Sequence, residues 1–377
     1  MTGHRRGQAR HRWRSILLGS VALATIATLV SACGGGSTDE PGGVDISSGS
    51  RHLNLVAYAV PKPGFDHVIP AFRATPEGAD IGFSASYGAS GDQSRKVARH
   101  VPADVVNFSV EPDITRLVKA GLVDEDWKKA APNNSTPFGS VVALVVRKGN
   151  PKNIHDWDDL LKPGVEVVTP NPGSSGSAKW NLLAPFAAKS NGGQNIDAGL
   201  DYISALVRDH IKVQPKSGRE ATTAFEQGQG DVLISYENEA IMLNRANATA
   251  APDNQVDYVI PPQTFKIENP VAVVNTTEDR AGANAFLQFL FTPQAQRIWA
   301  EQGFRPVLPE VIASTKPLFP GDIAKLWTIK DLGAVLGETA PVDDKGKKLT
   351  GWKAVDKVLF DSKSGEITEI YKSGGQQ

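Results

Sequence analysis

Apolar and β-branched residues gather into short runs that alternate with stretches of helical period. Runs at 53–57, 81–85 and 104–108 are typical of strands, and segments of helical character follow them. A helix is expected over 65–72, interrupted or ended by Pro70. Strands that alternate with helices predict a parallel-rich α/β sheet.

The alternation continues through the second half of the chain. A continuous apolar run at 141–146 predicts a buried strand, and further strands are expected at 165–168, 211–214 and 231–236. They are followed by a late strand at 271–274 and a long amphipathic helix over 281–301; Pro185 is expected to kink or end the helix that contains it. No internal repeat or sustained heptad occurs.

Small or hydroxylated residues follow four of these strands. They stand at 86–91, 173–177 and 217–219, and Tyr236 closes the fourth strand. In open α/β sheets ligands bind beyond the carboxyl ends of the strands. We therefore expect the four loops to converge on one cleft.

The stretch around Ser175 indicates what such a cleft binds. A helix that begins there leaves its first amide N–H groups without intrahelical partners and carries roughly half a positive charge at its end. Such an end attracts anions, and the small residues let a ligand approach the backbone. An ordinary Ser N-cap on an ordinary loop would explain this stretch alone. Its repetition along the chain favours an anion site.

The N-terminus predicts export. Five arginines precede an apolar run at 16–30, which is too short for a typical membrane span and has the order of a secretory signal. Val30-Ser31-Ala32-Cys33 then resembles the lipobox of bacterial lipoproteins, in which Cys33 carries a lipid. We expect a signal peptide at 1–32 and a lipidated flexible tether at 33–51. Because Cys33 is the only cysteine, no disulfide forms within the chain.

Length and charge restrict the number of domains and the classes of ligand. The chain has 377 residues, which suggests two domains. Cleavage before Cys33 removes five of the 40 basic residues and none of the 41 acidic ones, so the mature chain carries a formal charge of −6. Nucleic acid binding is disfavoured. A small anion must then be held by local dipoles and neutral donors.

Catalytic and metal chemistry find little support in the sequence. His155 lies near three aspartates, but their spacing matches no usual metal site, and helix capping explains them. No His lies in the four loops, no Gly-x-Ser-x-Gly motif occurs, and the one thiol is assigned to lipid. We expect no enzyme activity, no metal and no cofactor.

Several motifs carry a family resemblance between residues 52 and 327. They are Ser86-Tyr87-Gly88-Ala89-Ser90-Gly91, Arg147-Lys148-Gly149-Asn150-Pro151 with His155-Asp156-Trp157, Lys162-Pro163-Gly164 through Ser175-Gly176, and Gly230-Asp231-Val232-Leu233-Ile234 with Glu237-Asn238-Glu239-Ala240. With them the chain resembles the sulfate-binding proteins of sulfate and thiosulfate ABC transporters. The resemblance implies a two-lobed α/β fold of the periplasmic-binding-protein type II, with two crossover strands and the ligand cleft between the lobes. It places 52–137 and 268–377 in the first lobe and 138–267 in the second.

The resemblance also implies which residues hold the anion. They are Ser90, Gly91, Ser175, Gly176, Ser177, Gly218 or Arg219, and Tyr236. Two positions depart from the family pattern: Ser177 stands where Gly is common, and Tyr236 stands where a Trp donates its indole N–H. The turn after Gly218 is one residue shorter, which leaves the donor there open between Gly218 and Arg219. A Tyr236 packed against the hinge with its hydroxyl in water is the alternative.

The expected function is a monomeric, lipid-anchored sulfate receptor on the outer face of the cytoplasmic membrane. It would deliver sulfate to the permease subunits of an ABC transporter, whose ATPase is supplied in trans because the chain has no Gly-x-x-x-x-Gly-Lys-Ser/Thr motif. Thiosulfate, molybdate and phosphate are the alternatives, and a secreted hydrolase is the remote one. Phosphate keeps a proton near neutral pH and needs an acceptor, for which Asp92, Glu220 and Glu237 are candidates.

Overall fold

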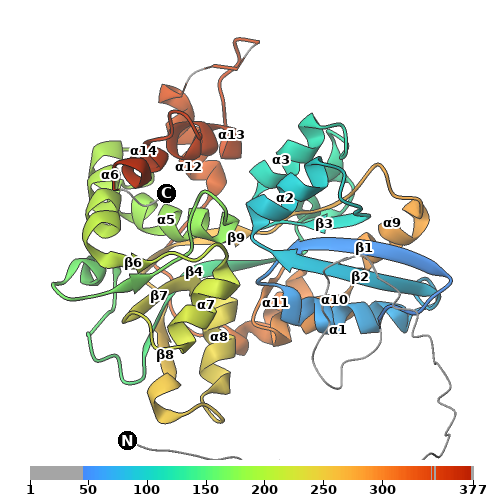
Figure 1. Cartoon of the computed structure of the whole chain (residues 1–377), viewed down its shortest axis with the longest axis horizontal. Coiled ribbons are helices and arrows are strands. Elements are labelled where there is room, and N and C mark those ends of the chain that lie inside the picture. The colour runs from blue at the N-terminus through green and yellow to red at the C-terminus, as the bar shows by residue number, and fades with distance from the viewer. Residues whose placement is uncertain (1–45, 341, 344, 375–377) are drawn as a thin grey trace, which may run out of the picture. The chain divides into compact units, whose positions relative to one another are not determined.

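The computed structural model describes residues 46–374 apart from 341 and 344 (Figure 1). All of them belong to the second of two compact units, Gly36–Gln377. The predicted signal peptide, Cys33 and most of the predicted tether lie outside the described residues. Among the residues that are described, no helix is both long and apolar enough to cross a membrane.

The first lobe is built on a four-stranded sheet in the order β10-β3-β1-β2. Its strands are β1 (Arg51–Tyr58), β2 (Ile81–Gly88), β3 (Val105–Asn107) and β10 (Val271–Val273). The first three run parallel and β10 runs antiparallel to β3. The accompanying helices are α1 (Lys62–Arg73), α2 (Ser90–Ala98), α3 (Glu111–Lys119), α4 (Pro132–Ser135), α9 (Arg280–Phe289), α10 (Pro293–Glu301) and α11 (Pro309–Thr315). Buried aromatic rings hold this lobe together, and those of Phe83 and Phe286 lie 4.9 Å apart.

The second lobe is built on an eight-stranded sheet whose main path is β12-β9-β4-β7-β5-β6. Its strands are β4 (Phe138–Arg147), β5 (Val167–Val168), β6 (Ile211–Val213), β7 (Val232–Tyr236), β8 (Val256–Val259), β9 (Gln263–Glu268), β11 (Arg305–Pro306) and β12 (Lys325–Trp327). Both β8 and β11 pair with β4. The helices are α5 (Gly176–Lys189), α6 (Ile196–Ala205), α7 (Gly218–Glu226) and α8 (Glu237–Ala246), with short 3-10 or π segments at Trp157–Leu161, Leu206–His210 and Pro252–Asn254. Two further 3-10 segments, Trp127–Lys129 and Lys316–Leu318, contact α4 and α11 of the first lobe.

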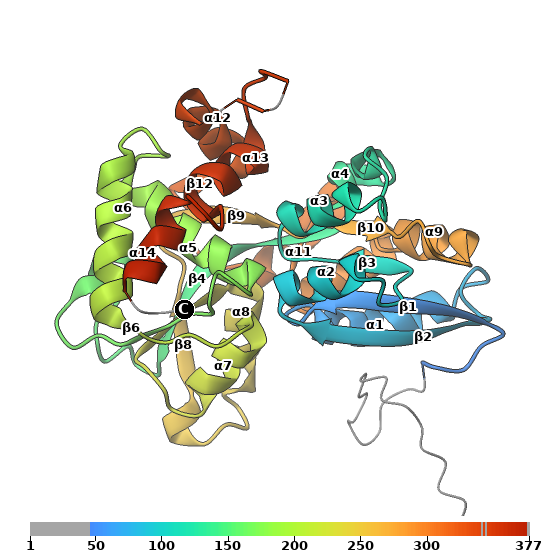
Figure 2. The ribbon, with the colours of Figure 1, turned by 45° about the horizontal axis from the view of Figure 1, so that its top comes forward.

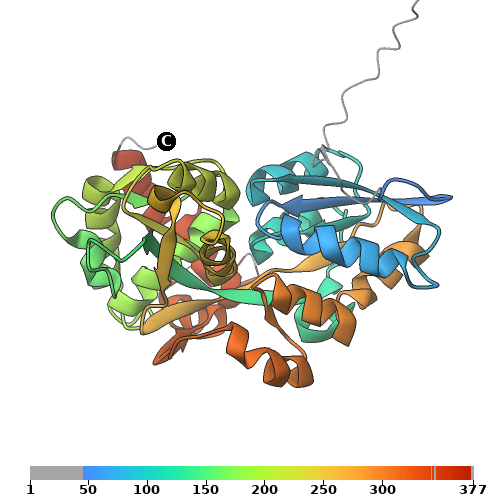
Figure 3. The ribbon, with the colours of Figure 1, turned by 90° about the horizontal axis from the view of Figure 1, so that it is seen from below.

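Two strands cross between the lobes side by side. The start of β4 pairs with the end of β9, so both strands run from the joint into the second lobe (Figure 3). The chain then passes the joint a third time. Its strand β11 pairs with the start of β4, and β12, farther along the chain, pairs with β9 in the second lobe. The two expected crossover strands are thus β4 and β9, and the passage between β11 and β12 joins the lobes in addition.

The C-terminal segment lies with the second lobe. It comprises α12 (Ile329–Thr339), α13 (Gly351–Val355), the π-helical turn Asp356–Phe360 and α14 (Glu366–Ser373). In Figure 2 these helices lie beside α5 and α6, and α14 packs on α6. The predicted division assigns 268–377 to the first lobe, whereas from β12 onward the chain packs with the larger sheet. Its α13 also reaches α3 of the first lobe.

Proline affects the helices less than its chemistry predicts. Neither helix ends at its proline, because α1 continues to Arg73 and α5 to Lys189. In α5 the burial of most side chains offsets the one backbone hydrogen bond that Pro185 removes. The predicted long helix over 281–301 is two helices, since Thr292 caps a new start at Pro293.

Candidate functional site

Three helices begin at the junction between the lobes. α2 starts at Ser90 in the first lobe, and α5 and α7 start at Gly176 and Gly218 in the second. The amides of a first helical turn have no intrahelical acceptor. Among the described hydrogen bonds none involves the N–H of Ser90, Gly176, Ser177, Gly218 or Arg219. The helix ends therefore present unpaired donors and partial positive charge to one region.

Glycines let the backbones at this junction approach closely. A Cβ atom on Gly91 would lie 2.8 Å from the carbonyl oxygen of Ser174, and one on Gly176 would lie 2.7 Å from Cβ of Ser109. A Cβ on Gly218 would lie 3.0 Å from Oγ of Ser177. Of the four predicted loops, those after β2, β5 and β6 therefore lie within contact distance of one another, and Ser109 after β3, which was not predicted, joins them beside Gly176.

The N–H of Gly91 donates to the carbonyl oxygen of Ser174 at 3.0 Å. This bond joins α2 of the first lobe to the loop before α5 of the second. We call it the seam bond. Because the N–H of Gly91 is used there, the structure places Gly91 at the seam and leaves the amide of Ser90 as the unpaired donor of α2.

The hydroxyl of Ser90 is committed to the protein. It donates to Oδ2 of Asp113 at 2.6 Å and accepts from the N–H of Ser109 at 3.0 Å. Oδ1 of Asp113 in turn accepts from Arg116 at 2.7 Å. Ser90 therefore offers a ligand its backbone rather than its side chain, and the network fixes the direction of that N–H.

Ser175 has the opposite arrangement. Its Oγ accepts from the N–H of Ala178 at 3.4 Å, which caps α5, while the residue is 2% exposed. An accepting hydroxyl keeps its own hydrogen. Within the part of the chain that the structure describes, no acceptor is recorded for that hydrogen, so Ser175 can donate it to a bound anion.

Tyr236 is fully buried at the end of β7. Its hydroxyl lies 2.7 Å from Oγ of Ser109. Burial raises the pKa of Tyr236 above its ordinary value, and hydrogen bonding, chiefly with Ser109, lowers it only in part. The phenol is therefore protonated at neutral pH and can donate. Its hydroxyl therefore lies beside Ser109 inside the junction rather than in water.

The side chain of Arg219 turns away toward α8. Its Nη2 lies 3.6 Å from Oε1 of Glu239, which is itself buried and accepts from Ser235 at 2.8 Å through its other oxygen. Arg219 thus offers the junction its N–H, as Gly218 does. Both amides are unpaired, so either can be the donor of this loop.

Sequence reasoning missed three buried polar residues near Tyr236, namely Ser109, Asn269 and Tyr58. Ser109 follows the short strand β3, and its carbonyl accepts from the side chains of Trp180 and Asn269 at 2.8 and 3.0 Å. The third, Tyr58, ends β1 with its hydroxyl buried and no recorded partner. The three residues stand at or just after the ends of β1, β3 and β9, where ligands of such sheets bind. However, β1 and β3 end without the small residues on which the prediction depended.

The candidate acceptors for a phosphate proton are engaged elsewhere. Asp92 pairs with Arg95 at 2.5 Å, Glu220 accepts from the N–H of Lys216 at 3.1 Å, and Glu237 is paired twice with Arg305 at 2.5 and 2.8 Å. No group of three or more His, Cys, Asp or Glu in the described residues is arranged to hold a metal. The site consists of amides and hydroxyls, which suits a fully ionised oxyanion.

Known proteins match most of the chain. The family model of the bacterial extracellular solute-binding proteins matches residues 53–305. The sulfate-binding protein of Synechococcus elongatus is 41% identical over 85% of this chain and 91% of its own. The thiosulfate-binding protein of Pseudomonas aeruginosa is 36% identical over 72% of this chain and 83% of its own.

A solved structure supports the same assignment. The sulfate-binding protein SubI from Mycobacterium tuberculosis H37Rv is 58% identical, with a TM-score of 0.74, and the match covers 82% of this chain and all of that one. The predicted two-lobed α/β fold is thereby confirmed, and the chain is a binding protein rather than an enzyme. The chain belongs to the bacterial extracellular solute-binding proteins, and among them to the family of the sulfate-binding proteins.

Proposed function

We propose that this protein is an extracytoplasmic receptor that binds sulfate between its two lobes. The observation that carries the proposal is the meeting of three helix N-termini whose first amides are unpaired, next to neutral hydroxyl donors. The names of the relatives from Synechococcus elongatus and Mycobacterium tuberculosis point to the same ligand.

The proposed donors come from both lobes. They are the amides of Ser90, Gly176, Ser177 and Gly218 or Arg219, and the hydroxyls of Ser175 and Tyr236, with Gly91 closing the site through the seam bond. Each donor is neutral, and sulfate at neutral pH has no proton to give. A charge-assisted hydrogen bond contributes more than a neutral one, so a set of neutral donors can hold a dianion without a counter-ion.

Delivery and anchoring complete the proposal. The receptor passes sulfate to the permease subunits of an ABC transporter, acts as a monomer, and is held at the outer face of the cytoplasmic membrane by lipid on Cys33. The support is the lipobox-like sequence at 30–33 and the family membership of the mature chain.

Binding of radiolabelled sulfate to the purified mature protein, measured by equilibrium dialysis, tests the proposal. Saturable binding of one sulfate per chain, with the ligand recovered unchanged, is expected. A thermal-shift panel of sulfate, thiosulfate, molybdate and phosphate then ranks the anions, because the tightest ligand raises Tm most. Stabilisation by phosphate and not by sulfate would overturn the sulfate assignment, and a chemically altered ligand would overturn the receptor.

A further inference from the structure

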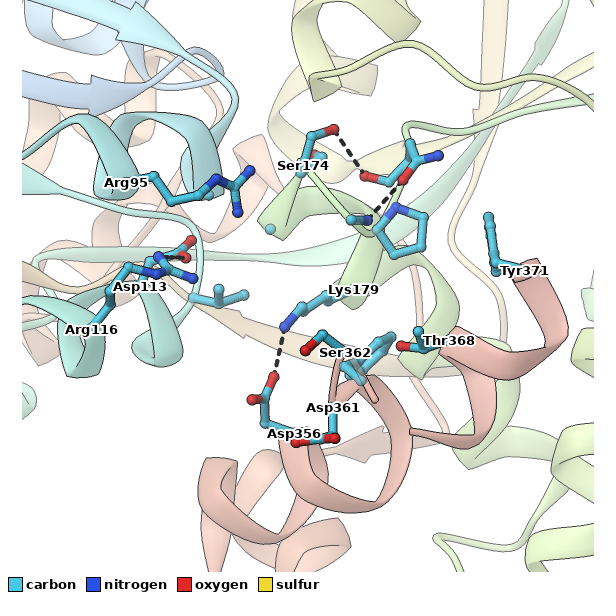
Figure 4. A pocket seen from close by; sticks show the side chains of 18 of the residues that line it. Arg95, Asp113, Arg116, Ser174, Lys179, Asp356, Asp361, Ser362, Thr368 and Tyr371 are labelled. Atoms are coloured by element: carbon cyan, nitrogen blue, oxygen red, sulfur yellow. Dashed lines mark hydrogen bonds and ion pairs between the residues drawn. The ribbon is translucent and has the colours of Figure 1, made fainter. Parts of the chain in front are cut away.

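A pocket of about 530 Å³ adjoins the proposed sulfate site on the solvent side. Three proposed site residues, Gly91, Ser175 and Gly176, form part of its wall. The other walls come from α2 and α3 of the first lobe and from the C-terminal segment (Figure 4). The pocket therefore borders the seam between the lobes and connects it with solvent.

Arg95 is the cation that lies against the seam. Its Nη1 and Nη2 lie 3.2 and 3.4 Å from the position that a Cβ atom on Gly91 would occupy. Gly91 is the residue whose N–H makes the seam bond to Ser174. Figure 4 shows Arg95 on one side of the pocket and Ser174 and Lys179 on the other.

The pairing of Arg95 leaves its charge available to the pocket. Its Nη2 binds Asp92 at 2.5 Å, but Asp92 is not a wall residue of the pocket, whereas Arg95 is. A guanidinium has five N–H donors, so one bond to Asp92 leaves others for an anion. Lys179 is similar, since it binds Asp356 at 2.6 Å and has three donors.

From these contacts we propose that Arg95 is an entry residue, which captures the incoming oxyanion at the seam and raises its rate of association with the site. The proposal rests on the proposed function. It assigns Arg95 no place in the final site, where every donor is neutral. The mature chain carries a formal charge of −6, so a dianion approaching it meets overall repulsion. A local cation beside the entrance offsets this repulsion and speeds diffusional encounter.

The test compares charge removal inside and outside the pocket. Arg95→Gln removes the charge at the seam, and Arg99→Gln is the matched control because Arg99 ends the same helix about 6 Å farther along and is not a wall residue. Asp356→Asn removes a carboxylate from the pocket wall and is expected to act in the opposite direction. Arg95→Lys keeps the charge and should retain most of the rate.

Equilibrium dialysis with radiolabelled sulfate gives Kd, a rapid-filtration isotope chase gives koff, and their ratio gives kon. At about 10 mM NaCl, Arg95→Gln should lower kon about fivefold, the effect of one unit charge on a dianion at roughly 7 Å in water, with koff unchanged. The difference should fall below about twofold at about 300 mM NaCl, where screening acts over about 6 Å.

The outcomes separate the two proposals. A wild type that retains no sulfate overturns the proposed function and this inference with it. A wild type that binds sulfate, with an Arg95→Gln kon no lower than that of Arg99→Gln, overturns the inference alone. A loss that appears in koff, or that is as large at high salt as at low salt, also overturns it, because it would make Arg95 part of the final site.

Discussion

The hydroxyl of Tyr236 lies 2.7 Å from Oγ of Ser109, and the two residues belong to different lobes. Tyr236 ends β7 of the second lobe, and Ser109 follows β3 of the first. Two hydroxyls thus meet across the junction, and each of them can both donate and accept.

Tyr236→Phe should weaken sulfate binding by about 1–3 kcal/mol, since it removes the hydroxyl and keeps the buried ring. Tyr236→Trp should restore part of the affinity by supplying an indole N–H. Titration calorimetry gives the affinities, and Ser109→Ala completes a double-mutant cycle that separates the anion bond from the bond between the lobes. If the Phe variant binds as tightly as the wild type, Tyr236 is not a donor.

Ser175→Ala should cost about 1.5–3 kcal/mol of binding free energy, or roughly 10- to 150-fold in Kd, because the free hydroxyl hydrogen is lost. The variant also removes the cap of α5, so stability should fall by about 1 kcal/mol. Val at this position should bind more weakly still, since its branch crowds the anion.

Asn195→Ala is the matched control for Ser175, because Asn195 caps α6 away from the junction. It should lower Tm by a similar amount and leave the Kd for sulfate unchanged. An affinity of Ser175→Ala within twofold of the wild type would remove this residue from the site.

Gly91→Ala should weaken sulfate binding at least tenfold, about 1.4 kcal/mol, because the new Cβ would lie 2.8 Å from the carbonyl oxygen of Ser174 where the lobes meet. The obstacle is backbone, so the lobes must stay farther apart. Gly88→Ala is the control, since its Cβ would meet only the side chain of Gln93 at 3.4 Å. Calorimetry that gives equal affinities for the two variants would contradict the role of the seam bond.

Sulfate affinity should be nearly constant between about pH 5 and 8. Amides and hydroxyls do not titrate there, and burial raises the pKa of Tyr236, so its phenol stays neutral. Calorimetry at several pH values measures this, and a tenfold change would indicate a titrating carboxylate and a protonated ligand such as phosphate.

The raised pKa of Tyr236 has a second consequence at alkaline pH. Because the folded state holds this proton more tightly than the unfolded state does, its contribution to stability is complete below about pH 10 and is lost as the pH rises beyond that value. Denaturant unfolding between pH 8 and 11 should therefore show a decreasing free energy of unfolding above about pH 10.

Cys33→Ala should release the protein from the membrane fraction, because the mature chain would then lack its lipid. Fractionation of cells that express both forms checks this result. Unchanged membrane partitioning of the variant would contradict lipidation at Cys33.

The architecture could be predicted from the sequence because each strand end is marked by the residues that directly follow it. The turns at Gly91, Gly176 and Gly218 are recognisable as small residues between a strand and a helix, and the strand-end rule places them together. The structure brings these three turns together at the junction, and their role as anion donors stays a prediction. The hydrogen bond from the N–H of Gly91 to Ser174 could not be predicted, because it forms only where the two lobes meet and no local sequence pattern encodes that contact.

Other features depended on tertiary packing in the same way. Ser109 has no distinctive neighbours in sequence, and its role emerges only where Tyr236, Trp180 and Asn269 surround it. Pro185 lies in a helix that burial sustains. The segment after β11 was assigned to the first lobe, but the pairing of β12 with β9 returns it to the second.

The indole N–H of Trp180 donates to the carbonyl oxygen of Ser109 at 2.8 Å, from α5 of one lobe to the strand end of the other. When the lobes separate, this donor exchanges a fixed carbonyl for water, and the buried ring gains contact with solvent. Indole emission depends on the polarity around the ring. The fluorescence of Trp180 should therefore change when the junction between the lobes opens or closes.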